Sequence, residues 1–117
     1  MLPLACAALG RKQQALLDYD QALRLEPGLG VAYLNRGALL VEAGRAAEAE
    51  ADLRKALEKG ADPAAAYYNL AVVHLARQDR VAALESVRTA LRHNPDHARS
   101  LELLKRLTDR RTKFLTP

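Results

Sequence analysis

The chain has 117 residues, half of them hydrophobic, and carries a formal net charge of +4. So large an apolar fraction excludes a disordered chain. Only 4% of the residues are aromatic and Trp is absent, so the core must be built from Ala, Leu and Val, a mixture that suits helices at close approach. The composition therefore predicts one all-α domain.

Seven helices are predicted from apolar residues that recur at helical spacing and from the Gly and Pro residues that end helices. They lie, in chain order, near residues 3–9, 12–26, 30–43, 46–59, 64–77, 80–93 and 97–110. The turns at Gly10, Gly44 and Gln78 are so short that the helices on either side must lie antiparallel. Residues 112–117 are expected to fray.

The chain also repeats itself with a period of 34 residues. Small and apolar positions recur at Ala15, Ala49 and Ala83, at Ala22, Ala56 and Ala90, and at Leu23, Leu57 and Leu91; Tyr33 matches Tyr67 and Asn35 matches Asn69. Such a period indicates that each unit is covered only by its neighbours in a one-dimensional stack. The prediction is a right-handed superhelical solenoid of antiparallel helix pairs.

The repeated positions resemble the tetratricopeptide repeat. In the second unit they are Tyr33, Gly37, Leu40, Gly44, Ala49, Leu53 and Ala56, and in the third Tyr67, Leu70, Ala71, His74, Ala83, Val87, Ala90 and Pro95. The resemblance divides the chain into a partial first repeat (1–29), a second repeat (30–63), a third repeat (64–97), a capping helix (98–111) and a tail (112–117).

Two departures from the repeat pattern carry expectations. Arg36 stands where the family usually has an apolar residue, so we expect it to snorkel, with its stem on the core and its charge in water. The first helix, 3–9, is truncated and cannot cover the next helix by itself. We therefore expect either an excerpt from a longer array or an N-terminal edge that pairs with another copy.

The resemblance implies that the first helix of each repeat lines a concave groove that holds protein partners. The candidate peptide-binding residues are Val31, Leu34, Asn35, Tyr68, Asn69, Val72, Arg99 and Arg106. Asn35 and Asn69 each offer a donor and an acceptor to the backbone of an extended peptide. Arg99 and Arg106 suit an acidic or C-terminal carboxylate group. We expect a non-catalytic protein–protein interaction module that binds an extended peptide or a partner helix.

Three other functions remain as alternatives. The chain could be a structural spacer or oligomerisation segment of a larger protein. Asn69 and Arg99 resemble part of the carboxylate clamp of some co-chaperones, although Leu103 stands where that clamp has an Arg. A nucleic-acid binder would use Arg88, Arg92, Arg99, Arg106, Arg110, Arg111 and Lys113 as phosphate contacts, but Phe114 is the one aromatic residue among them.

No catalytic or metal-binding constellation is evident in the sequence. His93 and His97 are four residues apart, but Pro95 between them prevents one helical face from carrying both. We expect no enzyme, no metal or cofactor and no small-molecule substrate. Every apolar segment after Ala8 is interrupted before the ~18 residues that span a bilayer. The single cysteine, Cys6, favours a reducing compartment, and we expect a cytoplasmic protein.

Overall fold

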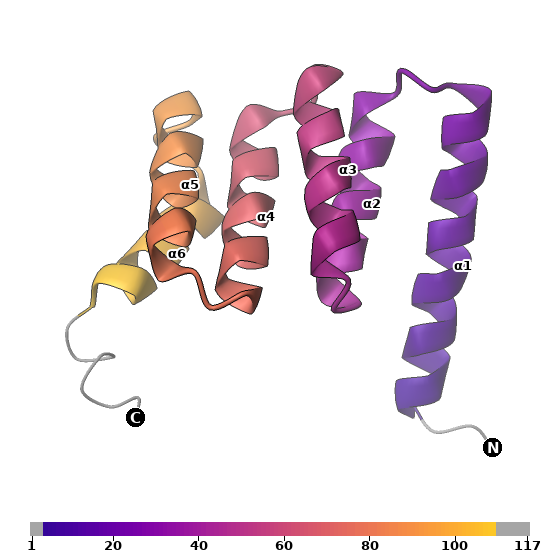
Figure 1. Cartoon of the computed structure of the whole chain (residues 1–117), viewed down its shortest axis with the longest axis horizontal. Coiled ribbons are helices and arrows are strands. Elements are labelled where there is room, and N and C mark those ends of the chain that lie inside the picture. Colours follow the sequence, from indigo (N-terminus) through magenta and orange to yellow (C-terminus); the bar gives the residue numbers. More distant parts are fainter. Residues whose placement is uncertain (1–3, 110–117) are drawn as a thin grey trace.

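The part of the chain that the structure describes is a stack of six α-helices. The computed structural model describes the backbone of residues 4–109 and the side chains of residues 10–109. The helices are α1 (Leu4–Leu25), α2 (Gly30–Glu42), α3 (Ala46–Glu58), α4 (Pro63–Ala76), α5 (Arg80–His93) and α6 (Ala98–Thr108). They run alternately up and down, with α1 at one end of the stack and α5 and α6 at the other (Figure 1). The predicted all-α stack of antiparallel helices is confirmed.

The N-terminal helix differs from the prediction, because residues 3–9 and 12–26 are not separated at Gly10 and α1 is continuous. In the pairs α2–α3 and α4–α5 the chain reverses at a residue with positive φ, 77° at Gly44 and 61° at Gln78. Each of these turns lets one helix pack on the other. No other part of the chain packs near Gly10, since a Cβ built there would meet no atom within 4 Å. A turn at Gly10 would therefore lose helical hydrogen bonds without gaining packing, while keeping Gly inside the helix costs only about 1 kcal/mol. Residues 4–109 therefore form six helices where seven were predicted.

Three helix ends share one backbone geometry. In each, the N–H after the turn residue donates to the carbonyl oxygen five residues earlier, at 2.9 Å. The turn residues are Gly44, Gly60 and Gln78, all with positive φ. This is the Schellman arrangement, which satisfies the last carbonyl groups of a helix. Gln78 differs from the two glycines in carrying a Cβ, so its left-handed conformation costs about 1 kcal/mol.

Alanines at the repeated positions are the points where helices approach most closely. Ala49, Ala56, Ala83 and Ala90 have no exposed surface. Their equivalents in α1, Ala15 and Ala22, are only half-buried, because the N-terminal part of α1 continues straight on and does not fold back over them. A repeated alanine is thus fully buried only where a neighbouring helix packs over it.

Two apolar clusters share the interior. The first joins α2, α3 and α4 through Leu34, Leu40, Ala49, Leu53, Ala56, Ala66, Leu70 and Val73. The second joins α4, α5 and α6 through Ala71, Ala83, Val87, Leu103 and Leu107. Because α4 contributes to both clusters, it connects the two ends of the stack.

Gly37 allows α2 and α3 to pack at short distance. A Cβ on Gly37 would lie 2.9 Å from the side chain of Leu53, which is fully buried. Leu53 has no free space to move into, because protein interiors are close-packed. The family position that carries Gly here is therefore required by the packing of this hairpin.

Arg36 is held by two carboxylates and does not extend into water as expected. Its Nε and Nη2 donate to the two oxygens of Asp52 in α3 at 2.7 and 2.8 Å, and its Nη1 donates to Asp20 in α1 at 2.8 Å. The hydrogen bonds to Asp52 raise the pKa of Arg36. Its guanidinium group also lies 5.6 Å from the ring centre of Tyr33. Arg36 thus links three helices, beside a cavity of about 350 Å³ that includes Leu16 and Arg45 in its lining.

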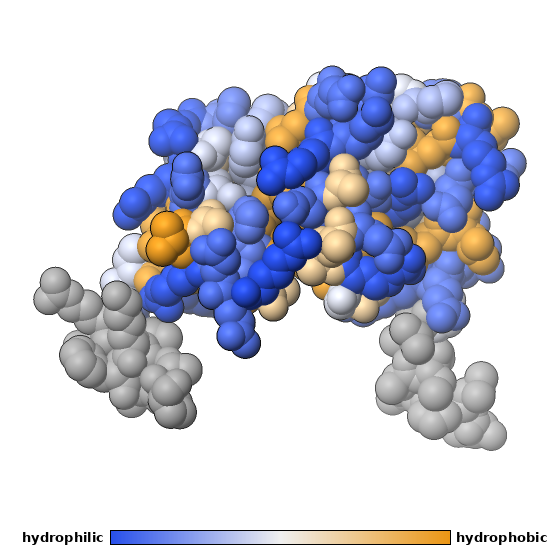
Figure 2. Space-filling model, in the orientation of Figure 1, coloured by the Kyte–Doolittle hydropathy of each residue, from blue (hydrophilic) through white to orange (hydrophobic). Residues whose placement is uncertain are grey.

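The side of the stack formed by α3 and α5 is mostly hydrophilic. Figure 2 shows this side, with hydrophobic residues gathered over α1 at the right and in a smaller spot over the lower part of α5 at the left. Leu17 and Leu25 are among the exposed apolar residues of α1, and Val81 is the one that α5 exposes most. Of the exposed large apolar residues in the described part of the chain, Leu17, Leu25, Val81 and Leu101 lie on helices at the two ends of the stack, and Val31 lies on α2.

Candidate functional site

The first helix of each pair lies on one side of the stack. α4 contacts both α2 and α6, and in Figure 1 α2 stands behind α3 and α6 behind α5. The eight candidate residues divide among these three helices: Val31, Leu34 and Asn35 on α2, Tyr68, Asn69 and Val72 on α4, and Arg99 and Arg106 on α6. We call this side the A face.

Three of the candidate residues line one hollow between α4 and α6. Tyr68, Arg99 and Arg106 surround a space of about 50 Å³, together with Glu102 and Leu103. Arg106 lies 3.5 Å from Glu102 one helical turn away, in an exposed pair. Arg99 is exposed and forms no ion pair with another described residue. Since an exposed pair such as Arg106–Glu102 contributes little energy, both guanidinium groups are available to an anionic group at this hollow.

The two carboxamides differ in the groups that they leave unused. Asn35 is exposed, and its side chain bonds to no residue in the described part of the chain. Asn69 is half-buried, and its Nδ2 donates to the carbonyl oxygen of Ala65 in the same helix at 3.0 Å. A carboxamide has two donors and an acceptor, so Asn69 keeps its Oδ1 and one N–H. Both residues retain the donor and acceptor that a peptide backbone requires.

The apolar candidates are not equally accessible. Val31 is 53% exposed, whereas Leu34 is 9% exposed and belongs to the first core cluster. Val72 is half-buried and packs against the second cluster. Tyr68 is half-buried, and its ring centre lies 5.9 Å from that of His97. Val31 thus offers exposed apolar surface, Tyr68 and Val72 offer part of theirs, and Leu34 packs in the core beneath α2.

Two tyrosine–histidine contacts near the turn between α5 and α6 were not anticipated from the sequence. One is the contact of Tyr68 with His97 described above. In the other, Tyr67 stacks on His93 with ring centres 5.7 Å apart and an interplanar angle of 8°. His97 precedes α6, and its Nδ1 lies 2.7 Å from the hydroxyl oxygen of fully buried Ser100. These contacts give the histidines packing and hydrogen-bonding roles. Among residues 10–109, no group of three or more His, Cys, Asp or Glu side chains gathers as metal ligands.

The sequence model of the tetratricopeptide repeat matches residues 40–107, more than half of the chain. The chain belongs to the tetratricopeptide repeat family. It superposes on the TPR domain of Arabidopsis OM64 with a TM-score of 0.79 at 24% identity, over 88% of this chain and 85% of that one. It superposes on YrrB, described as a TPR protein with an unusual peptide-binding site, with a TM-score of 0.76 at 27% identity, over 85% of this chain and 51% of that one.

Similarity to a longer protein is confined to part of that protein. The human protein O-mannosyl-transferase TMTC3 is 35% identical over 92 residues, which make up 78% of this chain and 10% of TMTC3. The chain therefore spans about a tenth of the length of that relative. Across the described tetratricopeptide repeats, no helix combines the length and apolar character needed to cross a membrane.

The tetratricopeptide repeat fold indicates a scaffold for protein–protein interaction. Leu103 is one residue that separates the A face from the carboxylate clamp considered above. Its side chain is buried in the second core cluster, at the position where the clamp would need an Arg. Leu103 also lines the hollow beside Arg99 and Arg106, where it contributes an apolar side chain in place of a cation. The A face therefore lacks one cation of that arrangement.

Proposed function

We propose that this tetratricopeptide repeat chain is a non-catalytic module that binds an extended peptide segment of a partner protein along the A face. The observation that carries the proposal is the pair of carboxamides at equivalent positions of neighbouring repeats. Asn35 on α2 and Asn69 on α4 both keep unused hydrogen-bonding groups. A polar side chain with no partner inside the scaffold is free to bond a ligand, and extended peptides present one donor and one acceptor per residue.

The remaining features of the A face favour one orientation of the peptide. Val31 exposes apolar surface at the α2 end, and Arg99 and Arg106 flank the hollow beside Tyr68 at the α6 end. Arg binds carboxylates through paired N–H groups. The proposed ligand therefore places an acidic residue or its C-terminal carboxylate at the α6 end, with its backbone crossing Asn69.

Selection from displayed 12-residue peptides with free C-termini, followed by titration, tests the proposal. For a selected peptide, Asn69→Ala should weaken binding by about 1–3 kcal/mol, because a buried partner group loses its hydrogen bond. Amidation of the peptide C-terminus should weaken binding, and Arg99→Ala should remove that difference. Gln21→Ala on exposed α1 is the matched carboxamide control. Selected peptides with unchanged affinity for the Asn35→Ala/Asn69→Ala double variant would refute the proposed site.

A second candidate function is a spacer or self-associating segment of a larger protein. The observation in its favour is the apolar surface of α1, where Leu17 and Leu25 are exposed and Ala15 and Ala22 are half-buried. Pairing of two copies through this surface would bury it. Light scattering over a range of concentrations measures the association, and a Leu17→Glu variant that stays monomeric where the unmodified chain dimerises would support it. A monomer at every concentration would refute pairing.

A further inference from the structure

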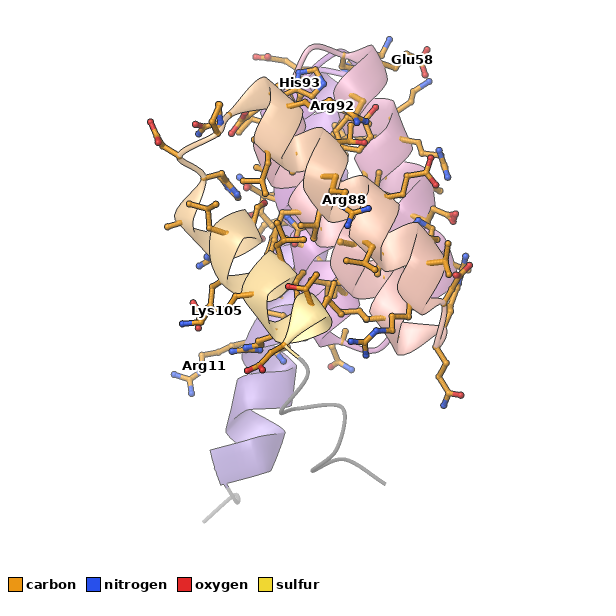
Figure 3. The ribbon with its side chains drawn as sticks, turned by 90° about the vertical axis from the view of Figure 1, so that its left-hand side faces the viewer. Arg11, Glu58, Arg88, Arg92, His93 and Lys105 are labelled. Carbon is orange, nitrogen blue, oxygen red and sulfur yellow. The ribbon has the colours of Figure 1, made fainter. Side chains whose placement is uncertain are left out.

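The stack ends in a surface that is both apolar and cationic, distinct from the A face. It is formed by α5 and α6, with no further described helix beyond them, and Figure 3 looks directly onto it. We call it the C-terminal end face and define it by six residues: Val81, Leu84, Arg88, Leu101, Leu104 and Lys105. One period of 34 residues earlier, α3 and α4 are the equivalents of α5 and α6, and there the next helix, α5, packs on α4. The α6 part of the C-terminal end face therefore corresponds to a surface on which this protein packs a helix.

Its apolar part is a stripe along the junction of α5 and α6. Val81 is 77% exposed and Leu101 is 46% exposed. Leu84 and Leu104 are half-buried and pack at the edge of the second core cluster. A hollow of about 390 Å³ lies over α5, with Val81 and Leu84 in its lining. Burial of exposed Val and Leu side chains is favourable at about 25 cal/mol per Å² of apolar area, so this stripe can supply the driving force for docking.

Cations flank the stripe on both sides. Arg88 and Arg92 line the hollow on α5, with Glu85 as the acidic residue in its lining, and Lys105 lies at the outer edge of α6 (Figure 3). Arg92 donates to the hydroxyl oxygen of Thr89 at 2.8 Å. Within the described residues, neither Arg88 nor Lys105 forms an ion pair. Positive charge at the rim of an apolar stripe therefore remains uncompensated.

Comparison with the preceding repeat indicates how charge is used at such a surface. The position on α3 that corresponds to Leu84 is Glu50, which pairs with Arg77 at the end of α4 at 3.0 Å. The position that corresponds to Arg92 is Glu58, which is exposed. Arg54, the equivalent of Arg88, pairs with Glu50, so α5 is apolar or basic where α3 supplies acidic partners. The cations of the C-terminal end face therefore lack the carboxylates that the preceding repeat provides, and acidic side chains of a ligand would complement them.

We propose that the C-terminal end face binds an acidic amphipathic helix of a partner protein. Leucine or similar side chains of that helix pack on Val81, Leu84 and Leu101, and its Glu or Asp residues pair with Arg88 and Lys105. A helix with apolar residues at i, i+3, i+4 and i+7 and acidic residues at its flanks presents this pattern. Nucleic acid complements the cations but leaves the apolar stripe unburied, because phosphate contacts are electrostatic.

Nuclear magnetic resonance titration of the isotope-labelled full chain with three synthetic helical peptides tests this proposal. The acidic probe has leucines on one face and glutamates on the flanks. The basic probe replaces each glutamate by lysine, and the scrambled probe keeps the acidic composition without an apolar face. We expect the acidic probe to shift the amide signals of Leu84 and Leu101 and to bind about tenfold more tightly than the other two.

Charge reversal in the protein provides the decisive comparison. The exposed pair Arg88→Glu/Lys105→Glu should reverse the preference, so that the basic probe binds more tightly than the acidic one. The double reversal Arg11→Glu/Arg24→Glu on exposed α1 changes the net charge equally and is the matched control. The Asn35→Ala/Asn69→Ala variant should bind the acidic probe normally, which separates this site from the A face.

Four results would overturn the proposal. Equal binding of acidic and scrambled probes would show attraction by charge alone. Tighter binding of a single-stranded oligonucleotide at the same signals would assign the face to nucleic acid. Concentration-dependent shifts at Val81 in the free chain would assign it to a second copy, and nuclear Overhauser contacts from Phe114 to Leu84 would assign it to the chain's own tail.

Discussion

Replacing Arg36 by Met should destabilise the protein by about 2–3 kcal/mol. The substitution keeps an apolar stem of similar length but leaves Asp52 without both of its hydrogen bonds. Breaking a fully buried pair costs about 3–5 kcal/mol, because the remaining charge stays desolvated. The side chain of Asp52 is 10% exposed and that of Arg36 is 22% exposed. Because water partly solvates the pair, the expected cost falls below that of a fully buried pair, to about 2–3 kcal/mol.

The double variant Arg36→Met/Asp52→Leu should recover most of that loss. Removing both charges replaces the ion pair by apolar groups of similar size, a change that is often neutral. Asp20→Asn alone should cost less than about 1 kcal/mol, since that arm of the network is more exposed. Urea unfolding followed by circular dichroism measures all three variants. A single variant that loses less than about 1 kcal/mol, or a double variant no more stable than the single one, would refute this account of the buried charge.

Three further substitutions test other parts of the structure by the same unfolding measurement. Gln78→Gly should stabilise the protein by about 0.5–1 kcal/mol, because glycine adopts the φ of 61° without steric cost; a loss of stability would contradict the assigned turn. Gly37→Ala should destabilise it by about 1–3 kcal/mol through the collision with Leu53, and an unchanged midpoint would show that the hairpin can widen. The pKa of Glu50 is lowered from its ordinary value of 4.5, so its ion pair with Arg77 stabilises the fold above that pH and is lost as pH falls through the lowered pKa. Glu50→Gln should therefore flatten the decline in stability below pH 4.5, and a parallel decline in both proteins would exclude Glu50 as its cause.

The pKa of Glu50 reflects two opposing effects. Burial raises it, and the charges and hydrogen bonds of Arg54 and Arg77 outweigh that effect, so the net direction is downward. Arg77 lies at the end of α4 and Glu50 on α3, 3.0 Å apart. The pH dependence thus reflects first the charge of Arg54 in the same helix and then the contact with Arg77 of the neighbouring repeat.

The fold could be predicted to the extent that the repeat itself encodes it. Ala49, Ala56, Ala83 and Ala90 are buried as their periodicity indicates, since each sits where two helices must approach. The continuity of α1 through Gly10 could not be predicted, because Gly is compatible both with a turn and with a helix interior. What decides between them is whether a partner helix packs against the residues on either side, and that information lies outside the local sequence.

Arg36 shows the same limit for side chains. Its departure from the repeat pattern marks it as unusual, and snorkelling is the usual solution for a lone cation on an apolar face. The two acceptors are Asp20 and Asp52, each 16 residues away. This equal spacing could have predicted the network. In a stack of antiparallel helices, residues at equal distances before and after a given residue lie on the two neighbouring helices and can face it.

The candidate site follows from the sequence only at positions with no packing role. Helical spacing places Leu34 and Asn35 side by side on α2, yet Leu34 packs in the core and Asn35 is exposed. A difference of one residue rotates a side chain by about 100° around a helix, which separates core from surface. The resemblance to the tetratricopeptide repeat identifies the helix that binds, whereas the burial of each side chain depends on the neighbouring helix.

The distribution of unpaired polar groups separates the two proposed binding surfaces. On the A face, unused hydrogen-bonding groups belong to Asn35 and Asn69, whose spacing follows the 34-residue period. A ligand that bonds both must therefore extend along the stack, across successive repeats. On the C-terminal end face, Arg88 and Lys105 lie on two helices of the same end, so a ligand that contacts both lies across the end and not along it. The two surfaces use different residues of α6, Arg99 and Arg106 on the A face and Leu101 and Lys105 on the C-terminal end face, so we expect a partner at the end face to leave the peptide in place.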